Sequence, residues 1–285
     1  MWRHIQFGAM SAEKTALPVS SSAEPELCAA QRLYRDVLLL LEEHRVPHAV
    51  SGAFALREHT GVGRPVKDLD IFLTSEAAGV TLDLLRKQGF ECEICDPVWL
   101  AKAHRDDFFV DFITGMSNAA ITVTDSWIAR ARPAEILGVP TRILAAEELL
   151  ASKIFVVRRE RFDGADIAHI VYATGGRLDW GRILELAGSH WEMLLWTLLL
   201  FRYVYPAQSH YVPLLVWTQL VNRLMFKLLN PDPSARFRGS LVDENMFAID
   251  VNEWGLDDLL SEYRASRARK IEWPGDDVQS RRNAA

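Results

Sequence analysis

Cysteine is scarce in this chain. Only Cys28, Cys92 and Cys95 occur among its 285 residues, and an odd number this small excludes the disulfide framework on which many small secreted domains depend. We therefore expect a protein of the reducing cytoplasm. Cys92 and Cys95 have the spacing of half a structural zinc site, but the sequence has no second such pair, so free thiols are the simpler interpretation.

Long apolar runs are also missing. The longest, at residues 193–201, contains Thr197 and lies between Glu192 and Arg202, and it is far shorter than the about 18 residues that a membrane span requires. We therefore expect no membrane partner. The formal net charge of -6 argues against a basic coat over the whole surface. No DNA-reading motif is present, while a local patch for RNA stays open.

Several catalytic signatures are absent as well. The chain has no G-x-x-x-x-G-K-[ST] and no G-x-S-x-G, and its GVGRPV segment lacks the third glycine of a dinucleotide-binding fingerprint. These absences argue against P-loop ATPases, hydrolases with a nucleophile elbow and Rossmann dehydrogenases. The chain also has no His-Asp dipeptide, which disfavours the metal phosphohydrolases that use one.

The remaining sequence is that of a globular protein, with 49% hydrophobic and 25% charged residues. Residues 1–25 are rich in Ser, Pro and Ala and are predicted to be a mobile tail. Strands are predicted at 48–52, 67–74, 90–95, 108–114 and 139–144, and helices at 26–46, 52–61 and 81–88. This order predicts an α/β fold with a short mixed sheet over 26–144. Residues 145–272 are predicted to be a mainly helical C-terminal domain that begins with helix over 145–162, and 273–285 a frayed tail.

Three acidic residues indicate a metal site. Asp68 and Asp70 are two apart on a predicted strand, so both carboxylates face the same side while Leu69 faces the opposite, buried side. Asp111 interrupts the apolar strand 108–114, where an ionised carboxylate is costly unless it has a partner. Mg²⁺ prefers hard oxygen ligands and commonly takes one or two carboxylates together with substrate phosphates. Solvated acids at a strand end are the alternative interpretation of the pair alone.

The segment before these acids favours phosphate binding. A short strand runs into Gly52, and a helix follows at once. A glycine at this turn permits close approach of an anion, and the free amides at a helix N-terminus favour negative charge. Ser51, Gly52 and Ala53 at the turn, with Arg64 and Lys67 in the loop before the acids, are therefore candidate nucleotide-binding residues.

The order of Gly52-Ala-Phe-Ala-Leu, His-Thr-Gly, Arg64, Lys67-Asp-Leu-Asp and the later Asp111 resembles the nucleotidyltransferase superfamily. That superfamily includes DNA polymerase beta, the kanamycin and lincosamide nucleotidyltransferases and the abortive-infection toxin nucleotidyltransferases, and the resemblance is strongest to bacterial nucleotidyltransferase-like proteins with HTG and KDLD segments. It covers residues 45–175. Ala53 departs from the family pattern, which has Gly or Ser there, so a hydroxyl donor to the triphosphate is missing.

The resemblance implies roles for particular residues. Asp68 and Asp70 match the metal-binding pair, and Asp111 matches the third acid, which assists deprotonation of the acceptor hydroxyl. Toxin-like relatives carry a lysine and downstream acids on helices, so Lys153, Asp163 and Asp166 are their candidate counterparts. The implied cofactor is Mg²⁺, or Mn²⁺ in its place.

Structural alternatives exist for the residues outside the acid cluster. Lys153 in an apolar helix is equally compatible with a side chain that extends along the surface to solvent. Asp163 before Gly164 is compatible with a helix cap. The basic run from Arg158 to Arg161 is typical of a solvated helix face, with contact to RNA phosphates as the sharper alternative. For His59, packing within the fold is the expected role.

The sequence thus predicts a cytoplasmic, Mg²⁺-dependent enzyme that moves a nucleoside monophosphate from a nucleoside triphosphate such as ATP to a hydroxyl-type acceptor, with release of pyrophosphate. The acceptor is left open among a small molecule, a tRNA end and a protein. The alternative is a catalytically weak or inactive nucleotide-binding or partner-binding protein on the same fold, an interpretation supported by Ala53 and by Val66 beside the Lys-Asp pair.

Overall fold

The computed structural model describes residues 28–271 and 273. The predicted tail at 1–25 and all but the first residue of the predicted tail at 273–285 lie outside the described residues. The strands are β1 (Ala49–Val50), β2 (Leu69–Phe72), β3 (Glu91–Asp96), β4 (Leu100–Arg105), β5 (Phe108–Ile113), β6 (Arg132–Ile136), β7 (Val139–Ile143), β8 (Val157–Arg158) and β9 (Arg161–Phe162). The helices are α1 (Ala29–Glu43), α2 (Gly52–Thr60), α3 (Ser75–Lys87), α4 (Asp125–Ala129), α5 (Ala146–Lys153), α6 (Gly164–Ala173), α7 (Trp180–Ala187), α8 (Trp191–Val204), α9 (Leu214–Leu229), α10 (Gly239–Val242), α11 (Ala248–Asn252) and α12 (Leu259–Ala268).

A mixed sheet of seven strands forms the N-terminal part, in the order β3-β4-β5-β2-β1-β7-β6. Strands β2 and β5 run parallel, as do β1 and β7, and the other neighbours are antiparallel. The predicted α/β class with a mixed sheet is confirmed. In the parallel register of the two central strands, Asp70 lies directly beside Asp111.

Helix α1 covers one face of this sheet. Leu33, Val37, Leu38 and Leu41, which recur at helical spacing in the sequence, are all 2% exposed or less. They belong to one hydrophobic core that continues through the sheet into α5, α6 and α8. This core runs across residue 144. The division of the chain into two domains at that residue stays a prediction.

The predicted helix at 145–162 is wrong in its second half. Helix α5 ends at Lys153, and the hairpin of β8 and β9 follows. The β-branched pair Val156 and Val157 favours extended backbone over helix. Two strands were also missed: β4, whose LAKAHR sequence has low strand propensity, and β6, whose Pro133 is tolerated because β6 is the edge strand of the sheet.

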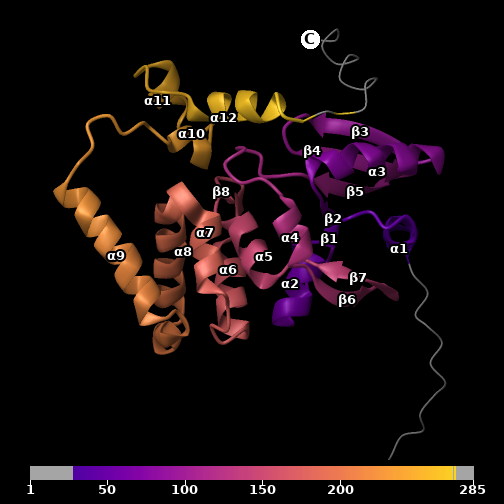
Figure 1. The fold of residues 1–285 in the computed structure, drawn as a ribbon, viewed down its shortest axis with the longest axis horizontal. Helices are drawn as coiled ribbons and strands as arrows, with labels where there is room; N and C mark the ends of the chain where they lie inside the picture. Colours follow the sequence, from indigo (N-terminus) through magenta and orange to yellow (C-terminus); the bar gives the residue numbers. More distant parts are fainter. Residues whose placement is uncertain (1–27, 272, 274–285) are drawn as a thin grey trace, which may run out of the picture.

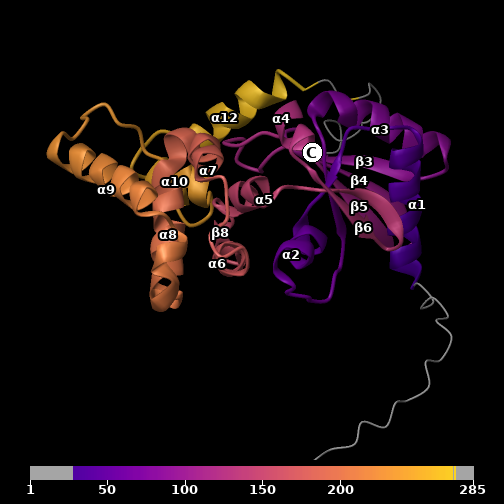
Figure 2. The ribbon, with the colours of Figure 1, turned by 60° about the horizontal axis from the view of Figure 1, so that its bottom comes forward.

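The C-terminal third is helical and folds back over the sheet. Figure 1 shows α8 and α9 at one end of the molecule and α12 crossing back toward β3, and Figure 2 shows the same arrangement from another side. The return is anchored by Arg264 on Asp96 at 2.8 Å and by the Asn118 amide, which donates to the Leu241 carbonyl at 2.8 Å. None of the helices described has the length and apolarity to cross a membrane.

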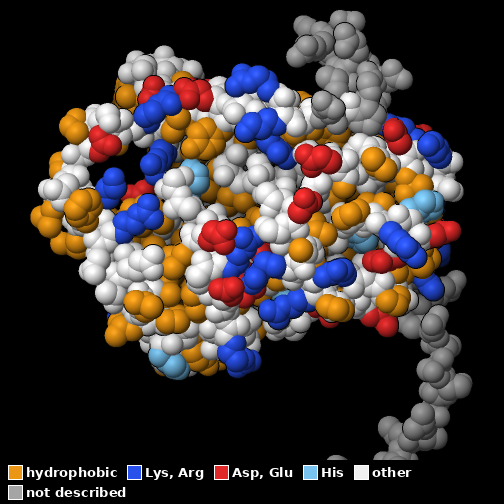
Figure 3. Space-filling view, viewed as in Figure 1, with side chains coloured by type: hydrophobic (Ala, Val, Ile, Leu, Met, Phe, Trp, Pro, Cys, Tyr) orange, Lys and Arg blue, Asp and Glu red, His pale blue; other side chains and the backbone are white. Residues whose placement is uncertain are grey.

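Apolar side chains gather on the outer surface of α8 and α9, where Figure 3 shows hydrophobic atoms at one end of the molecule. Leu214, Leu215 and Leu229 are each at least 75% exposed, and Tyr203 is 84% exposed. The Trp191 ring on α8 instead packs into the core, with the Arg223 guanidinium 4.8 Å from its centre. The tryptophan-rich segment therefore serves partly as core, as its continuous apolar pattern predicts.

Candidate active site

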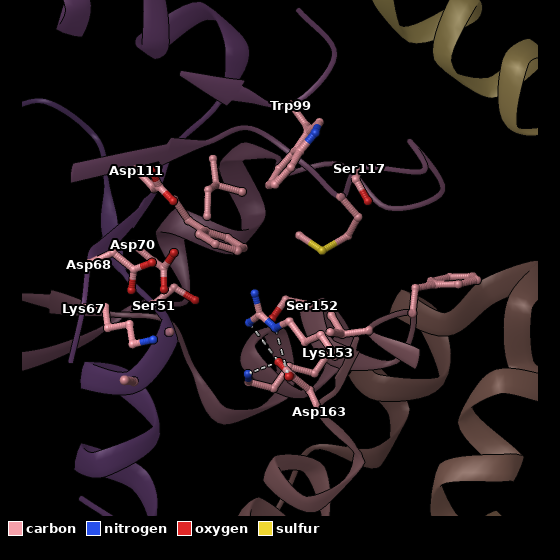
Figure 4. A pocket seen from close by; sticks show the side chains of 18 of the residues that line it. Ser51, Lys67, Asp68, Asp70, Trp99, Asp111, Ser117, Ser152, Lys153 and Asp163 are labelled. Carbon is pink, nitrogen blue, oxygen red and sulfur yellow. Dashed lines mark hydrogen bonds and ion pairs between the residues drawn. The ribbon is translucent and has the colours of Figure 1, made fainter. Parts of the chain in front are cut away.

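Three carboxylates meet on the central strands of the sheet. Asp68 precedes β2, Asp70 lies on it and Asp111 lies on β5, and one oxygen of each is within 4.8 Å of one from each of the others. Period-two geometry places Asp68 and Asp70 on the same side, while Leu69 between them is fully buried on the other. Figure 4 shows the three side chains together at one wall of a cavity.

The acids leave a negative charge that the fold compensates only in part. Burial, with Asp68 and Asp111 close by, raises the pKa of Asp70 from 3.8 to about 7. Burial also raises the pKa of Asp111, although the Lys102 ammonium lies 2.6 Å from its Oδ1 and opposes the rise. The three carboxylates supply hard oxygen donors, and Lys102 compensates part of their charge. This set of donors fits a divalent cation such as Mg²⁺ or Mn²⁺.

Gly52 makes the contact between the acids and helix α2 possible. Its φ is +56°, and a Cβ at this position would lie 1.8 Å from Asp70 Oδ2. The Ser51 amide donates to the Asp70 carbonyl at 2.8 Å, which ties the turn to β2. The first turn of α2, with Ala53, therefore lies beside the carboxylates, where helix dipole and free amides favour the phosphates that accompany a bound cation.

The opposite wall carries a buried ion cluster. Lys153 Nζ lies 2.7 Å from Asp163 Oδ2 and 2.8 Å from Asp166 Oδ2. Arg161 contacts Asp163 at 3.1 Å, and Arg64 reaches Asp166 at 2.5 Å from the loop that follows α2. Burial acts to raise the pKa of Asp163, but Lys153 and Arg161 hold this pKa below its ordinary value.

These contacts differ from the structural alternatives considered for Lys153, Asp163 and the basic run. Lys153 does not extend to solvent, because its side chain is only 6% exposed. Asp163 occupies the N-cap position of α6, but its carboxylate binds Lys153 and Arg161 and caps no helix amide. Arg158 lies on the β8–β9 hairpin and not on a helix face, and it donates to the Ser117 hydroxyl at 2.8 Å.

A cleft of about 610 Å³ lies between the two walls. It is lined by all but one of the candidate site residues: Ser51, Gly52, Ala53, Arg64, Lys67, Asp68, Asp70, Asp111, Lys153 and Asp163. Asp166 does not line the cleft, but its carboxylate binds Lys153 and Arg64, which do. Predicted as structural, His59 hydrogen-bonds through Nε2 to the Leu144 carbonyl at 2.7 Å, away from the cleft.

Other cleft residues were not predicted. The apolar ones are Pro65, Val66, Phe72, Trp99, Ile113, Met116, Phe155 and Val156, and the polar ones are Ser117, Asn118, Ser152, Arg158 and Arg161. Phe72 and Ile113 lie two residues beyond Asp70 and Asp111, so the period that places the acids on this face was sufficient to find them. The others lie in turns or on α5 and the segment after it, and no local pattern marks them.

The chain was compared with known proteins. No curated protein matches significantly. Among solved structures it is similar to the antibiotic-resistance factor ANT(2'')-Ia (18% identity, 64% of this chain and 95% of that chain covered, TM-score 0.40). It is also similar to the lincosamide antibiotic adenylyltransferase LnuA (15%, 50% and 96%, 0.37) and to an antigenic nucleotidyltransferase-like protein from Paracoccidioides brasiliensis (16%, 64% and 91%, 0.40).

The family comparison covers the sheet and the first helices after it. Residues 30–187 match the family described as "Nucleotidyl transferase of unknown function (DUF2204)". This match spans more than half of the 285 residues and includes both walls of the cleft. The chain is therefore an enzyme of the nucleotidyl transferase class and belongs to this family.

Proposed function

We propose that the protein transfers a nucleoside monophosphate from a nucleoside triphosphate to a hydroxyl-type acceptor, with Mg²⁺ or Mn²⁺ as cofactor. The observation that carries the proposal is the contact between Gly52 and Asp70. Because this glycine brings the N-terminus of α2 against the carboxylates, one site offers ligands for a cation and amides for the phosphates bound to it. A reaction on a metal-bound triphosphate needs both.

Residues on the wall that carries the acids share the work of binding. Asp68 and Asp70 would hold the cation that bridges to the triphosphate, and the amides at Gly52 and Ala53 would hold its β and γ phosphates. Lys67 is exposed at the same end of the cleft and adds a positive charge. When bound, the metal ions neutralise charge on the triphosphate and on the attacking oxygen.

Asp111 serves the acceptor side of the reaction. The acceptor oxygen attacks the α-phosphorus, the bond from this phosphorus to the bridging oxygen of the β-phosphate breaks, and pyrophosphate leaves in line. Asp111 takes the proton of the acceptor hydroxyl. Lys102, 2.6 Å from Oδ1 of this carboxylate, orients it toward the cleft.

The acceptor belongs to one of three classes: a small molecule such as an antibiotic, a tRNA end or a protein side chain. The low cysteine content supports a cytoplasmic place for the reaction. Ala53 keeps a second candidate in view, a nucleotide-binding protein without turnover, because a side-chain hydroxyl is missing at this turn.

The test measures metal-dependent binding first and chemistry second. The purified protein is titrated with non-hydrolysable ATP with and without Mg²⁺, and pyrophosphate release from ATP is then followed with an aminoglycoside, a lincosamide, bulk tRNA and protein acceptors. Asp68→Asn and Asp70→Asn are expected to abolish both signals. Asp83→Asn is the matched control, since Asp83 is an exposed acid on α3. Binding without release in all mixtures supports the second candidate, and absence of metal-dependent binding refutes both.

A further inference from the structure

The cleft has an apolar end that the proposed chemistry does not use. Trp99 and Met116 are half-buried there, and Phe155, whose ring packs edge-on against His190, also lines the cleft. Figure 4 shows Trp99 beyond Asp111 and across the cavity from Lys153. A half-exposed tryptophan at the wall of a cleft offers a flat apolar surface of a kind that binds planar rings.

This apolar end lies one step along the strands from the acids. Ile113 follows Asp111 by two residues on the same face of β5, a distance of roughly 7 Å along a strand. The Trp99 carbonyl accepts a hydrogen bond from the amide of Thr114, the next residue, at 2.9 Å. Gly52 and Trp99 line the same cleft of about 610 Å³, so a nucleotide whose phosphates lie at Gly52 has room to place its base against Trp99.

The turn that carries Trp99 is held rigidly. The Trp99 amide donates to the Asp96 carbonyl at 3.2 Å, and the Val98 amide donates to the Asp96 carboxylate at 2.9 Å. Arg264 from α12 binds both oxygens of that carboxylate, at 3.0 and 2.8 Å. The backbone of this turn is thus fixed before a ligand arrives, which reduces the entropy lost on binding.

Few polar groups near Trp99 remain to read the edge of a base. The Asn118 amide is committed at both ends, accepting from the Ala120 amide at 3.0 Å and donating to the Leu241 carbonyl at 2.8 Å. The Ser117 hydroxyl accepts from Arg158 and keeps its own hydrogen, which can turn toward an acceptor on either purine. No side-chain carboxylate or amide of the described cleft residues at this end is left to distinguish adenine from guanine.

We propose that Trp99 forms the nucleobase subsite of this enzyme and selects by ring size and not by base edge. This inference rests on the proposed function. Stacking depends on the area of the ring, so purine nucleoside triphosphates bind more tightly than pyrimidine ones. Every base has a flat face, and a rotatable hydroxyl distinguishes the two purines weakly, so ATP and GTP bind alike.

The test compares Trp99→Ala and Trp99→Phe with the unaltered protein. Non-hydrolysable ATP, GTP, CTP and UTP, each with Mg²⁺, are titrated by calorimetry, and Mg²⁺ tripolyphosphate serves as a ligand without a base. We expect ATP and GTP to agree within about threefold, and Trp99→Ala to weaken both by about tenfold. Trp99→Phe keeps most of the affinity, and tripolyphosphate binds all variants equally. Trp254→Ala is the control, since Trp254 is 67% exposed and does not line the cleft.

Each outcome decides a separate question. Trp99→Ala that binds ATP as tightly as the unaltered protein overturns the inference, as does a strong preference between ATP and GTP that survives the substitution. Weaker tripolyphosphate binding in Trp99→Ala shows a structural defect and also counts against it. If the unaltered protein binds neither tripolyphosphate nor any nucleotide with Mg²⁺, the proposed function itself has failed.

Discussion

Replacing Lys153 by Met removes the centre of the buried ion cluster. Methionine keeps most of the length of the side chain but deletes the ammonium that lies 2.7 Å from Asp163 and 2.8 Å from Asp166. Both carboxylates are at most 10% exposed. Their remaining partners, Arg161 and Arg64, are 70% and 49% exposed, so these compensate little.

The expected loss of stability is therefore large. Removing one member of a buried ion pair costs about 3–5 kcal/mol, mostly because a charge is left without a partner. We expect Lys153→Met to lower the free energy of unfolding by about 3 kcal/mol, since the two arginines still compensate part of the negative charge. Urea unfolding followed by circular dichroism measures this loss, with Lys87→Met, an exposed lysine at the end of α3, as the control.

A second variant separates charge from packing. If the cost comes from unpaired carboxylates, adding Asp163→Asn to Lys153→Met returns more than about 1 kcal/mol of it. Triphosphate affinity, measured well below the unfolding transition, is expected to fall at least tenfold in Lys153→Met, which is about 1.4 kcal/mol. If the free energy of unfolding of Lys153→Met lies within about 0.5 kcal/mol of that of the unaltered protein, the reasoning is refuted, because surface substitutions have effects of that size.

Three further predictions concern the acids and the segments that support them. Folding raises the pKa of Asp70 from 3.8 to about 7. The folded state therefore loses stability as the pH rises through this range, and the loss is on the order of 4 kcal/mol at pH 8. Without metal, Asp70→Asn should therefore melt higher than the unaltered protein at about pH 8 but equally at about pH 4, and a lower melting temperature at pH 8 contradicts this. Gly52→Ala should weaken Mn²⁺ binding more than tenfold by pushing Asp70 aside, whereas Gly255→Ala, with φ of +68° and open space around it, should leave binding unchanged. Arg264→Met frees the turn at Asp96 and should reduce ATP affinity but not tripolyphosphate affinity, and equal losses for both would show that α12 supports the whole cleft.

The cluster of three carboxylates was within reach of sequence analysis because its geometry is local. Asp68 and Asp70 share a face through the two-residue period of a strand, and Gly52 marks the turn before a helix. Asp111 required one further step, the argument that a carboxylate inside an apolar strand needs a partner. Each of these inferences involves one element at a time, and the parallel register of β2 with β5 brings them together.

The opposite wall depends on contacts that no local pattern encodes. Lys153 meets Asp163 only because the chain leaves the helix at Lys153 and turns through the β8–β9 hairpin, which the helical interpretation of 145–162 excluded. Trp99 lies in the turn before β4, a strand whose Ala and Lys content gives little indication of a sheet. Such features appear only when distant segments are packed.

The same contrast bears on how this enzyme chooses its substrates. The three carboxylates lie at the central strands, where register alone sets their spacing. The turn of Trp99 is held by Arg264, 168 residues away from Asp96 in sequence, and the Asn118 amide is fixed by Leu241, 123 residues away. Both anchors come from beyond residue 187, where the family match ends. Because these anchors support the cleft wall at Trp99 and Asn118, changes in this C-terminal segment can alter the shape of the cleft while the three carboxylates stay in place.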